Sequence, residues 1–160
     1  MALVYIAYGS NDRQARARIS DALDMLGQHL TILKQSTRYE TAPQYETNQP
    51  RFINGVISAS TELAPEQLLR LLQTIETDIG RVPTYRNGPR VIDLDILSYD
   101  DRIIETETLT IPHTLLHERA FVLIPWKDIA PEYTVPRYNM TVSALADTLP
   151  KGYDVQRLDI

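Results

Sequence analysis

Apolar positions along the chain change between two spacings, and these spacings predict a series of strands and helices. Short apolar or β-branched runs are typical of strands, whose side chains point alternately to two faces. Two other segments carry apolar residues every three to four positions, which is typical of helices with one buried face. The predicted strands are residues 3–8, 30–41, 52–61 and 90–99, and the predicted helices span about residues 12–26 and 65–79.

Glycine and proline mark where the predicted elements begin and end. Gly27 is expected to end the first helix in the left-handed conformation. Pro65 occupies a first-turn position of the second helix, and Gly80 closes that helix. Residues 42–50 and 81–89 are expected to be loops.

The resulting order, β-α-β-β-α-β, predicts a ferredoxin-like α+β fold, in which two helices cover one face of a four-stranded antiparallel sheet. The rest of the chain is a proline-punctuated extension. Within it we expect a short hairpin return near Ile103 and short helices around residues 115–123 and 142–148. No repeat or linker divides the chain, so residues 1–160 are expected to form a single domain.

Composition and charge exclude several classes of protein and site. The 160 residues carry a formal net charge of −5, which argues against a general nucleic-acid-binding protein. The absence of cysteine excludes disulfides, thiolate catalysis and cysteine-bound zinc. No apolar run has the length of a membrane span, and the first residues lack a signal-peptide pattern. We therefore expect a cytoplasmic monomer that acts on small molecules.

Two aspartates in the last predicted strand are the main candidates for chemistry. Strand alternation places Ile92, Leu94 and Ile96 on one face and Asp93 and Asp95 on the other, with the two aspartates roughly 7 Å apart. Two close carboxylates on an apolar strand repel each other, and a hard cation such as Mg²⁺ removes that repulsion. The alternative is that both aspartates lie on a solvated sheet face.

Arginines gather directly before this strand. Arg81, Arg86 and Arg90 accompany a rigid Gly-Pro turn in an otherwise acidic chain. Arginine binds phosphate oxygens in pairs, while aspartate holds the metal ion that neutralises phosphate charge. Carboxylates and arginines in this order indicate a site for a polyphosphate and a metal ion.

Two residues of the extension could complete such a site. His113 follows a proline in a loop and precedes Arg119 by six residues. Beside a phosphate, His113 could donate a hydrogen bond that stabilises charge developing during phosphoryl transfer. The alternative is an ordinary surface histidine. His113 and His117 do not have a convincing zinc spacing.

Two further groups of side chains could bind the flat parts of substrates. Gln73 and Glu76 lie three apart on the second helix and could contact a ribose or base, unless they form a solvated helix face. Phe52, Asn54 and Phe121 could form an aromatic slot with one amide that reads the edge of a heterocycle. For the two phenylalanines, the alternative is packing in the core.

The stretch from Arg86 to Leu97 joins a Gly-Pro-Arg turn to an Asp-x-Asp strand, and it resembles the signature of the 6-hydroxymethyl-7,8-dihydropterin pyrophosphokinase family. The resemblance continues in order through Tyr5-Ile-x-x-Gly-Ser-Asn11, Tyr39-x-Thr41, Gln49-Pro-x-Phe-Ile-Asn54, Ile75-Glu-x-x-x-Gly-Arg81, Leu109-Thr-Ile-Pro-His113 and Arg119-x-Phe121. It implies a ferredoxin-like fold. It also implies transfer of the pyrophosphoryl group of ATP to the hydroxymethyl group of a reduced pterin in folate biosynthesis, which leaves AMP.

The resemblance also implies a role for each site residue. Asp93 and Asp95 would hold two Mg²⁺ ions, Arg90 and Arg119 would bind phosphates, and His113 would contact the phosphoryl chain. The residues implied to bind ATP are Gln73, Glu76, Arg81, Arg86, Ile96 and Thr110. Those implied to bind the pterin are Thr41, Ala42, Gln44, Phe52, Asn54 and Phe121.

Two other functions fit parts of the pattern. The same metal pair would serve a different Mg²⁺-dependent phosphoryl or nucleotidyl transferase, and release of AMP would distinguish the pyrophosphokinase from it. A non-catalytic pterin- or nucleotide-binding module would fit the residues 83–87, where the chain departs from many members of the family. The retained aspartates, arginines and His113 favour the enzyme.

Overall fold

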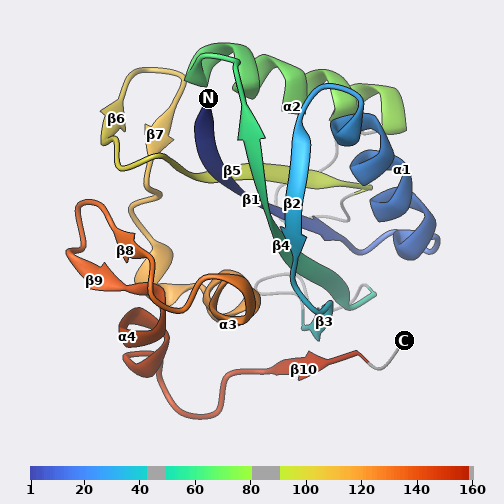
Figure 1. Cartoon of the computed structure of the whole chain (residues 1–160). Coiled ribbons are helices and arrows are strands. Elements are labelled where there is room, and N and C mark those ends of the chain that lie inside the picture. Colours follow the sequence, from blue (N-terminus) through green and yellow to red (C-terminus); the bar gives the residue numbers. More distant parts are fainter. Residues whose placement is uncertain (43–49, 81–90, 159–160) are drawn as a thin grey trace.

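The computed structural model describes residues 1–42, 50–80 and 91–158, and its centre is a six-stranded antiparallel sheet (Figure 1). The strands follow the order β10-β3-β4-β1-β5, and β2 also pairs with β4. The strands of this sheet are β1 (Ala2–Ser10), β2 (Thr31–Gln35), β3 (Tyr39–Thr41), β4 (Phe52–Thr61), β5 (Asp93–Tyr99) and β10 (Val155–Arg157). The predicted ferredoxin-like arrangement is confirmed, with β1 between β4 and β5.

Helices cover both faces of the sheet. The helices α1 (Ala15–Gly27) and α2 (Pro65–Ile79) lie on one face, and α3 (Ala120–Ile129) lies on the other (Figure 1). The C-terminal extension also contains the short helix α4 (Val142–Asp147), which packs against α3. Its remaining elements are β6 (Ile104–Glu105), β7 (Thr110–Ile111), the 3-10 helix η1 (Leu116–Glu118), β8 (Thr134–Val135) and β9 (Met140–Thr141). No helix of the described residues has both the length and the apolar character needed to cross a bilayer.

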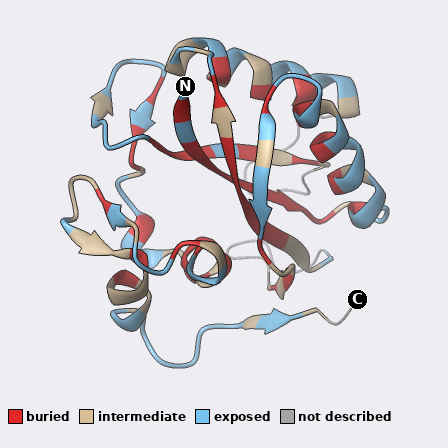
Figure 2. Ribbon diagram, viewed as in Figure 1, coloured by how far each residue is buried: buried red, intermediate tan, exposed pale blue. Residues whose placement is uncertain are grey.

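The two sheet faces bury two separate hydrophobic cores. Val4 and Ile6 alternate with Tyr5 and Ala7 along β1, and the first pair packs toward α1 and α2 while the second packs toward α3. Buried residues therefore run along both sides of the central strands (Figure 2). The second core includes Trp126, so the extension covers much of the face that four strands and two helices would leave open.

A β-bulge divides β5 between the two cores. Opposite β1, the pairing passes from Ile96 directly to Ser98, so Leu97 is an extra residue of β5. Leu97 packs in the core beside α3, whereas Tyr99 returns to the core beside α1 and α2. From Asp93 to Leu97 the side chains of β5 point alternately to the two faces of the sheet. Asp93 therefore lies on the same face as Leu97.

Some predicted boundaries are wrong. The predicted strand 30–41 is two strands, β2 and β3, which pair with successive parts of the longer β4. Between them Ser36 exchanges hydrogen bonds with the backbone of Val56: its N–H donates to the carbonyl and its hydroxyl accepts from the N–H, each over 2.9 Å. The chain therefore changes register at Ser36 without leaving β4.

The predicted left-handed cap at Gly27 is also wrong. Gly27 is the last residue of α1, and the following Gln28 is still right-handed, with φ of −76°. The N–H of Leu30 bonds the carbonyl of Leu26 over 2.9 Å, so the last turn is closed without a change of handedness. The prediction holds at Gly80, whose φ of +117° ends α2 in the left-handed region.

Three further boundaries differ from expectation. The last strand of the core fold begins at Asp93 rather than at residue 90. The return near Ile103 pairs with β7 in a separate small sheet instead of with β5. The helix expected at 115–123 is a 3-10 turn followed by α3, which continues to Ile129.

Candidate active site

The candidate site lies on the sheet face that carries α3, at the end where β1, β4 and β5 come together. The central residue is Gly9 on β1, which pairs with Asn54 of β4 on one side and with Asp93 of β5 on the other. Neighbouring strands lie about 4.8 Å apart, so this register places the backbones of Asn54 and Asp93 roughly 10 Å from each other. A predicted pterin residue and a predicted metal residue therefore lie on either side of β1 at the same level of the sheet.

Asp93 and Asp95 have the arrangement that the sequence predicts. Leu94 and Ile96 point into the core beside α1 and α2, so the aspartates share the opposite face of β5. Asp95 is exposed and Asp93 is half-buried. Among the described residues, no cluster of three or more His, Cys, Asp or Glu forms a metal site. The exposed carboxylate of Asp95, on the same strand face as the half-buried Asp93, fits Mg²⁺, which completes its coordination with water and substrate phosphates.

A cleft of about 210 Å³ opens beside Asp95 at the outer edge of β5. It brings together residues from β5, β7 and the segment leading into α3, which are distant in the sequence. Four predicted site residues line it with Asp95, namely Ile96, Thr110, His113 and Arg119. The cleft is therefore acidic on its strand side and basic on the side of the extension.

His113 is held as a neutral hydrogen-bond donor. Its Nδ1 accepts the backbone N–H of Leu115 over 3.0 Å, which leaves the proton of the neutral ring on Nε2. Burial and the nearby positive charge of Arg119 lower the pKa of His113, while Asp95 opposes them by raising it. At neutral pH the ring can therefore donate from Nε2 without carrying a charge.

Arg119 stands at the start of α3, with its guanidinium 5.7 Å from the centre of the Phe121 ring. Stacking of this kind orders an arginine side chain while its N–H groups stay free to bind an anion. Phe121 is half-buried, so its ring supports Arg119 as well as packing beside the second core.

The predicted pterin residues form a second group. The Nδ2 of Asn54 donates to Oγ1 of Thr41 over 2.7 Å, and both side chains are buried. A methyl group on Gly9 would come within 2.6 Å of Oδ1 of Asn54, closer than real contacts allow. Gly9 thus provides the space in which the Asn54 carboxamide lies. Phe52 is half-buried at the start of β4, in register with Thr41.

Sequence reasoning missed the roles of Ser10 and Asn11. Ser10 donates from its hydroxyl to the carbonyl of Val91 over 2.6 Å, and Asn11 donates from Nδ2 to the carbonyl of Pro50 over 3.2 Å. Both side chains are almost fully buried. They attach the end of β1 to the residues just before β4 and β5. Their signal in the sequence is a pair of small polar residues at the end of an apolar strand, within the Gly-Ser-Asn11 part of the resemblance.

Glu76 of α2 lies in the interior of the protein and not on an exposed helix face. It is buried, and its Oε2 accepts the backbone N–H of Leu94 over 2.9 Å. Gln73, one turn earlier on α2, is exposed and does not line the cleft beside Asp95. The predicted residues Gln44, Arg81, Arg86 and Arg90 lie outside the described residues.

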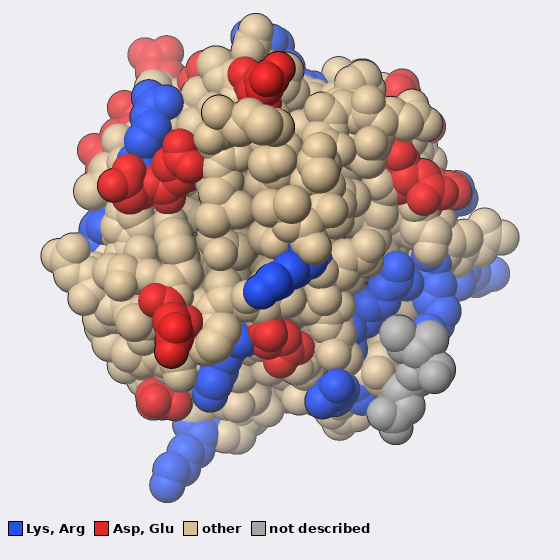
Figure 3. Space-filling model, in the orientation of Figure 1, with Lys and Arg blue, Asp and Glu red and all other residues tan. Residues whose placement is uncertain are grey.

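A second hollow, of about 670 Å³, lies between the start of α1 and the end of the sheet that contains β3. It is lined by Arg13, Arg16 and Arg51 among others, and positive side chains gather on the right of the view in Figure 3. None of the predicted site residues that the structure describes lines it. Among the described residues, Asp95, His113 and Arg119 therefore lie together at one cleft, and Asn54 lies beside Gly9.

Comparisons with known proteins agree on one family. The 7,8-dihydro-6-hydroxymethylpterin-pyrophosphokinase family profile matches residues 5–131. A 2-amino-4-hydroxy-6-hydroxymethyldihydropteridine pyrophosphokinase from Pseudomonas aeruginosa is 42% identical over 83% of this chain and 83% of its own. The enzyme of that name from Methylorubrum extorquens is 36% identical over 96% and 98%.

Longer proteins match as well. The folic acid synthesis protein FOL1 of Dictyostelium discoideum is 42% identical over 98% of this chain, which spans 24% of that protein. Among solved structures, a Plasmodium falciparum HPPK-DHPS has a TM-score of 0.76 at 18% identity, covering 91% of this chain and 43% of its own. That likeness shows the fold alone. The chain thus spans only about a quarter of the length of several curated relatives, and by its sequence it belongs to the 7,8-dihydro-6-hydroxymethylpterin-pyrophosphokinase family.

Proposed function

We propose that the chain transfers the β,γ-pyrophosphoryl group of ATP to the hydroxymethyl group of 6-hydroxymethyl-7,8-dihydropterin, giving AMP and the pterin diphosphate. The observation that carries the proposal is the register at Gly9, which sets Asn54 and the Asp93–Asp95 pair on one sheet face with only β1 between them. The names of relatives such as the Pseudomonas aeruginosa pyrophosphokinase support the same reaction.

In this proposal the two substrates bind from opposite sides of Gly9. The pterin, a flat heterocycle with polar edges, binds against β3 and β4, where Asn54 and Thr41 meet its hydrogen-bonding edge. The triphosphate of ATP extends along the cleft beside Asp95, within reach of His113 and Arg119. The acceptor hydroxyl then faces the β-phosphorus across β1, the single strand that separates the two half-sites.

The reaction needs no protein nucleophile. The pterin hydroxyl oxygen attacks the β-phosphorus, the bond from that phosphorus to the oxygen bridging to the α-phosphate breaks, and AMP leaves with that oxygen. The hydroxyl proton passes to solvent. Catalysis of phosphoryl transfer depends mainly on positioning and on stabilising charge, and both requirements match this site.

Each side chain then has a defined task. His113 donates from Nε2 to a phosphate oxygen, and Arg119, ordered on the Phe121 ring, pairs with another phosphate oxygen. Asp93 and Asp95 would hold two Mg²⁺ ions, which would supply positive charge to neutralise the charge that develops on the phosphates. The proposed roles of Arg81, Arg86 and Arg90 are further phosphate contacts.

Product analysis tests the proposal directly. The chain is incubated with ATP, Mg²⁺ and 6-hydroxymethyl-7,8-dihydropterin, and the nucleotides and pterins are separated. We expect AMP and pterin diphosphate in equal amounts, and only when all three components are present. ADP as the product would indicate a different phosphoryl transferase. Tight pterin binding without any AMP would indicate a binding module.

A further inference from the structure

The C-terminal end of the chain adds a strand to the sheet next to the proposed pterin site. Strand β10 pairs with β3 in the register Val155 to Thr41 and Arg157 to Tyr39. A backbone hydrogen bond from Leu158 to Arg38, over 2.9 Å, extends this pairing. Residues 132–160 lie beyond the family match, which ends at residue 131. Part of the chain outside that match therefore contacts a strand of the site (Figure 1).

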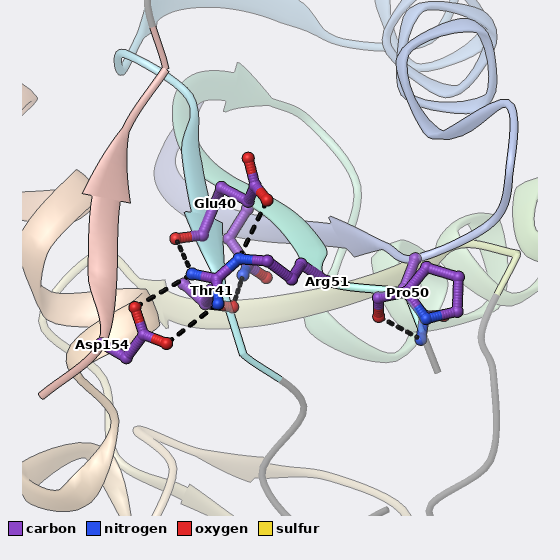
Figure 4. Close-up of polar contacts among 7 residues, drawn as sticks. Glu40, Thr41, Pro50, Arg51 and Asp154 are labelled. Atoms are coloured by element: carbon purple, nitrogen blue, oxygen red, sulfur yellow. Dashed lines mark hydrogen bonds and ion pairs between the residues drawn. The ribbon is translucent and has the colours of Figure 1, made fainter. Parts of the chain in front are cut away.

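Arg51 connects the C-terminal segment to β3. Its two terminal nitrogens each contact one carboxylate oxygen of Asp154 over 2.9 Å, and its Nε contacts the carboxylate of Glu40 over 2.9 Å. Figure 4 shows the Arg51 side chain reaching between Glu40 on β3 and Asp154. A two-point arginine–carboxylate contact fixes orientation as well as distance. The three side chains thus join the tail, β3 and the start of β4.

The strand held in this way is short and depends on its neighbours, which include α3, because the Tyr39 hydroxyl donates to the carboxylate of Asp128 over 2.7 Å. β3 has three residues and lies between β4 and β10. Strands this short are marginal without partners on both sides. Thr41 pairs with Phe52 of β4 and with Val155 of β10, and its hydroxyl accepts the Asn54 amide. Displacement of β3 would therefore displace the partner that orients Asn54.

We infer that residues 152–158 are a positioning element of the acceptor-substrate site, and that Asp154 acts through Arg51 to hold β3 and hence Thr41 and Asn54 in place. The inference rests on the proposed function, since it assigns the acceptor to Asn54 and Thr41. The segment touches neither Asp95 nor the cleft that lies beside it. Its effect is therefore confined to the pterin half of the site and leaves the ATP half unchanged.

Steady-state kinetics of Asp154→Ala tests this separation. Asp154 is exposed, so the substitution leaves no buried group without a partner. We expect the KM for the pterin to rise about three- to fivefold, the scale of an exposed ion pair that belongs to a network. The KM for ATP and kcat should stay unchanged. Loss of folded protein alone would lower kcat and leave both KM values where they are.

Further variants sharpen the test. Asp154→Glu keeps the carboxylate and should restore most of the pterin KM, whereas Arg51→Lys keeps the charge but cannot make the two-point contact. A chain ending at residue 151 should show the largest rise. Arg137→Met is the matched control, because Arg137 also forms an arginine–carboxylate ion pair, with Glu105 inside the extension and away from β3. It should leave the pterin KM unchanged.

The possible outcomes separate this inference from the proposed function. If the unaltered chain forms AMP, but removal of Asp154 or of residues 152–160 leaves the pterin KM unchanged, the inference fails and the proposed function stands. Equal increases in the KM values for pterin and ATP would also overturn it. If the unaltered chain forms no AMP, the proposed function fails and the inference fails with it.

Discussion

The carboxylate of Glu76 accepts a hydrogen bond from the backbone N–H of Leu94, with 2.9 Å between Oε2 and the nitrogen. Leu94 is the residue between Asp93 and Asp95, and β5 is the last strand of its sheet. A buried N–H at a sheet edge needs a partner, and α2 supplies it through Glu76. The contact fixes the backbone from which both aspartates project.

Replacing Glu76 tests this positioning role. Glu76→Ala leaves the Leu94 N–H buried without its acceptor, which should cost about 1–3 kcal/mol of stability. It should also lower turnover about 10- to 100-fold, the usual effect of losing a residue that orients metal ligands. Glu76→Gln keeps an acceptor oxygen and is the matched control. Thermal unfolding and AMP release would measure both effects, and equal turnover in the two variants would contradict the role.

Asp95→Asn tests the proposed metal pair. The change keeps the size of the side chain but removes a charge and one strong acceptor. We expect AMP release to fall about 100-fold or more, because charge stabilisation at the phosphates would be lost. Asp101→Asn, in the exposed turn after β5, is the control and should retain full activity. Asp95→Asn with normal turnover would remove Asp95 from the site.

Gly9→Ala tests the close approach between β1 and Asn54. The added methyl group would lie 2.6 Å from Oδ1 of Asn54, so the amide or the strand must move. We expect a loss of about 1–3 kcal/mol of stability, together with weaker pterin binding, as measured by urea unfolding and calorimetry.

Gly27→Ala is the control for that substitution. Its methyl group would meet no atom closer than 4.0 Å, and Gly27 lies in a helix. Alanine is the better helix former, so stability should stay the same or rise by up to about 1 kcal/mol. Similar losses in the Gly9 and Gly27 variants would indicate that contact with Asn54 is not the cause.

The lowered pKa of His113 predicts a pH dependence of stability. Burial and Arg119 hold the pKa of His113 in the folded chain below the ordinary value of 6.5. Between these two pKa values the unfolded chain binds the proton and the folded chain does not, so stability falls as pH falls through that range. His113→Asn should lack this component. Urea midpoints at pH 7.5 and pH 5.5 would show it, and identical losses in both proteins would refute it.

Local patterns in the sequence correctly predicted the structural features that depend only on residues close together in the chain. Alternation alone places Asp93 and Asp95 on one face, because a strand turns each successive side chain over, whatever lies beside it. Pro65 and Gly80 predicted both ends of α2, since one has a fixed φ and the other tolerates a positive φ. The order of strands and helices then indicated the ferredoxin-like arrangement.

The sequence-based prediction failed where pairing between strands far apart in the chain, and not the preference of the residues themselves, decides the structure. The run 30–41 favours strand throughout, but β4 pairs with its two halves in different registers, and the break falls at Ser36. The bulge at Leu97 is likewise invisible in a continuous apolar run, because it exists only relative to β1. Both features depend on which residues face each other across strands.

The sequence by itself therefore determined the two helices of the core fold, the order of its elements along the chain and the identity of the chemical groups, because these follow from spacing and residue type. Only the tertiary structure decided which groups meet. Gly9 joins Asn54 to Asp93, Glu76 binds Leu94, and Asp154 reaches Arg51 from the end of the chain. Such contacts arise when strands far apart in sequence take up one register, and no local pattern contains that register.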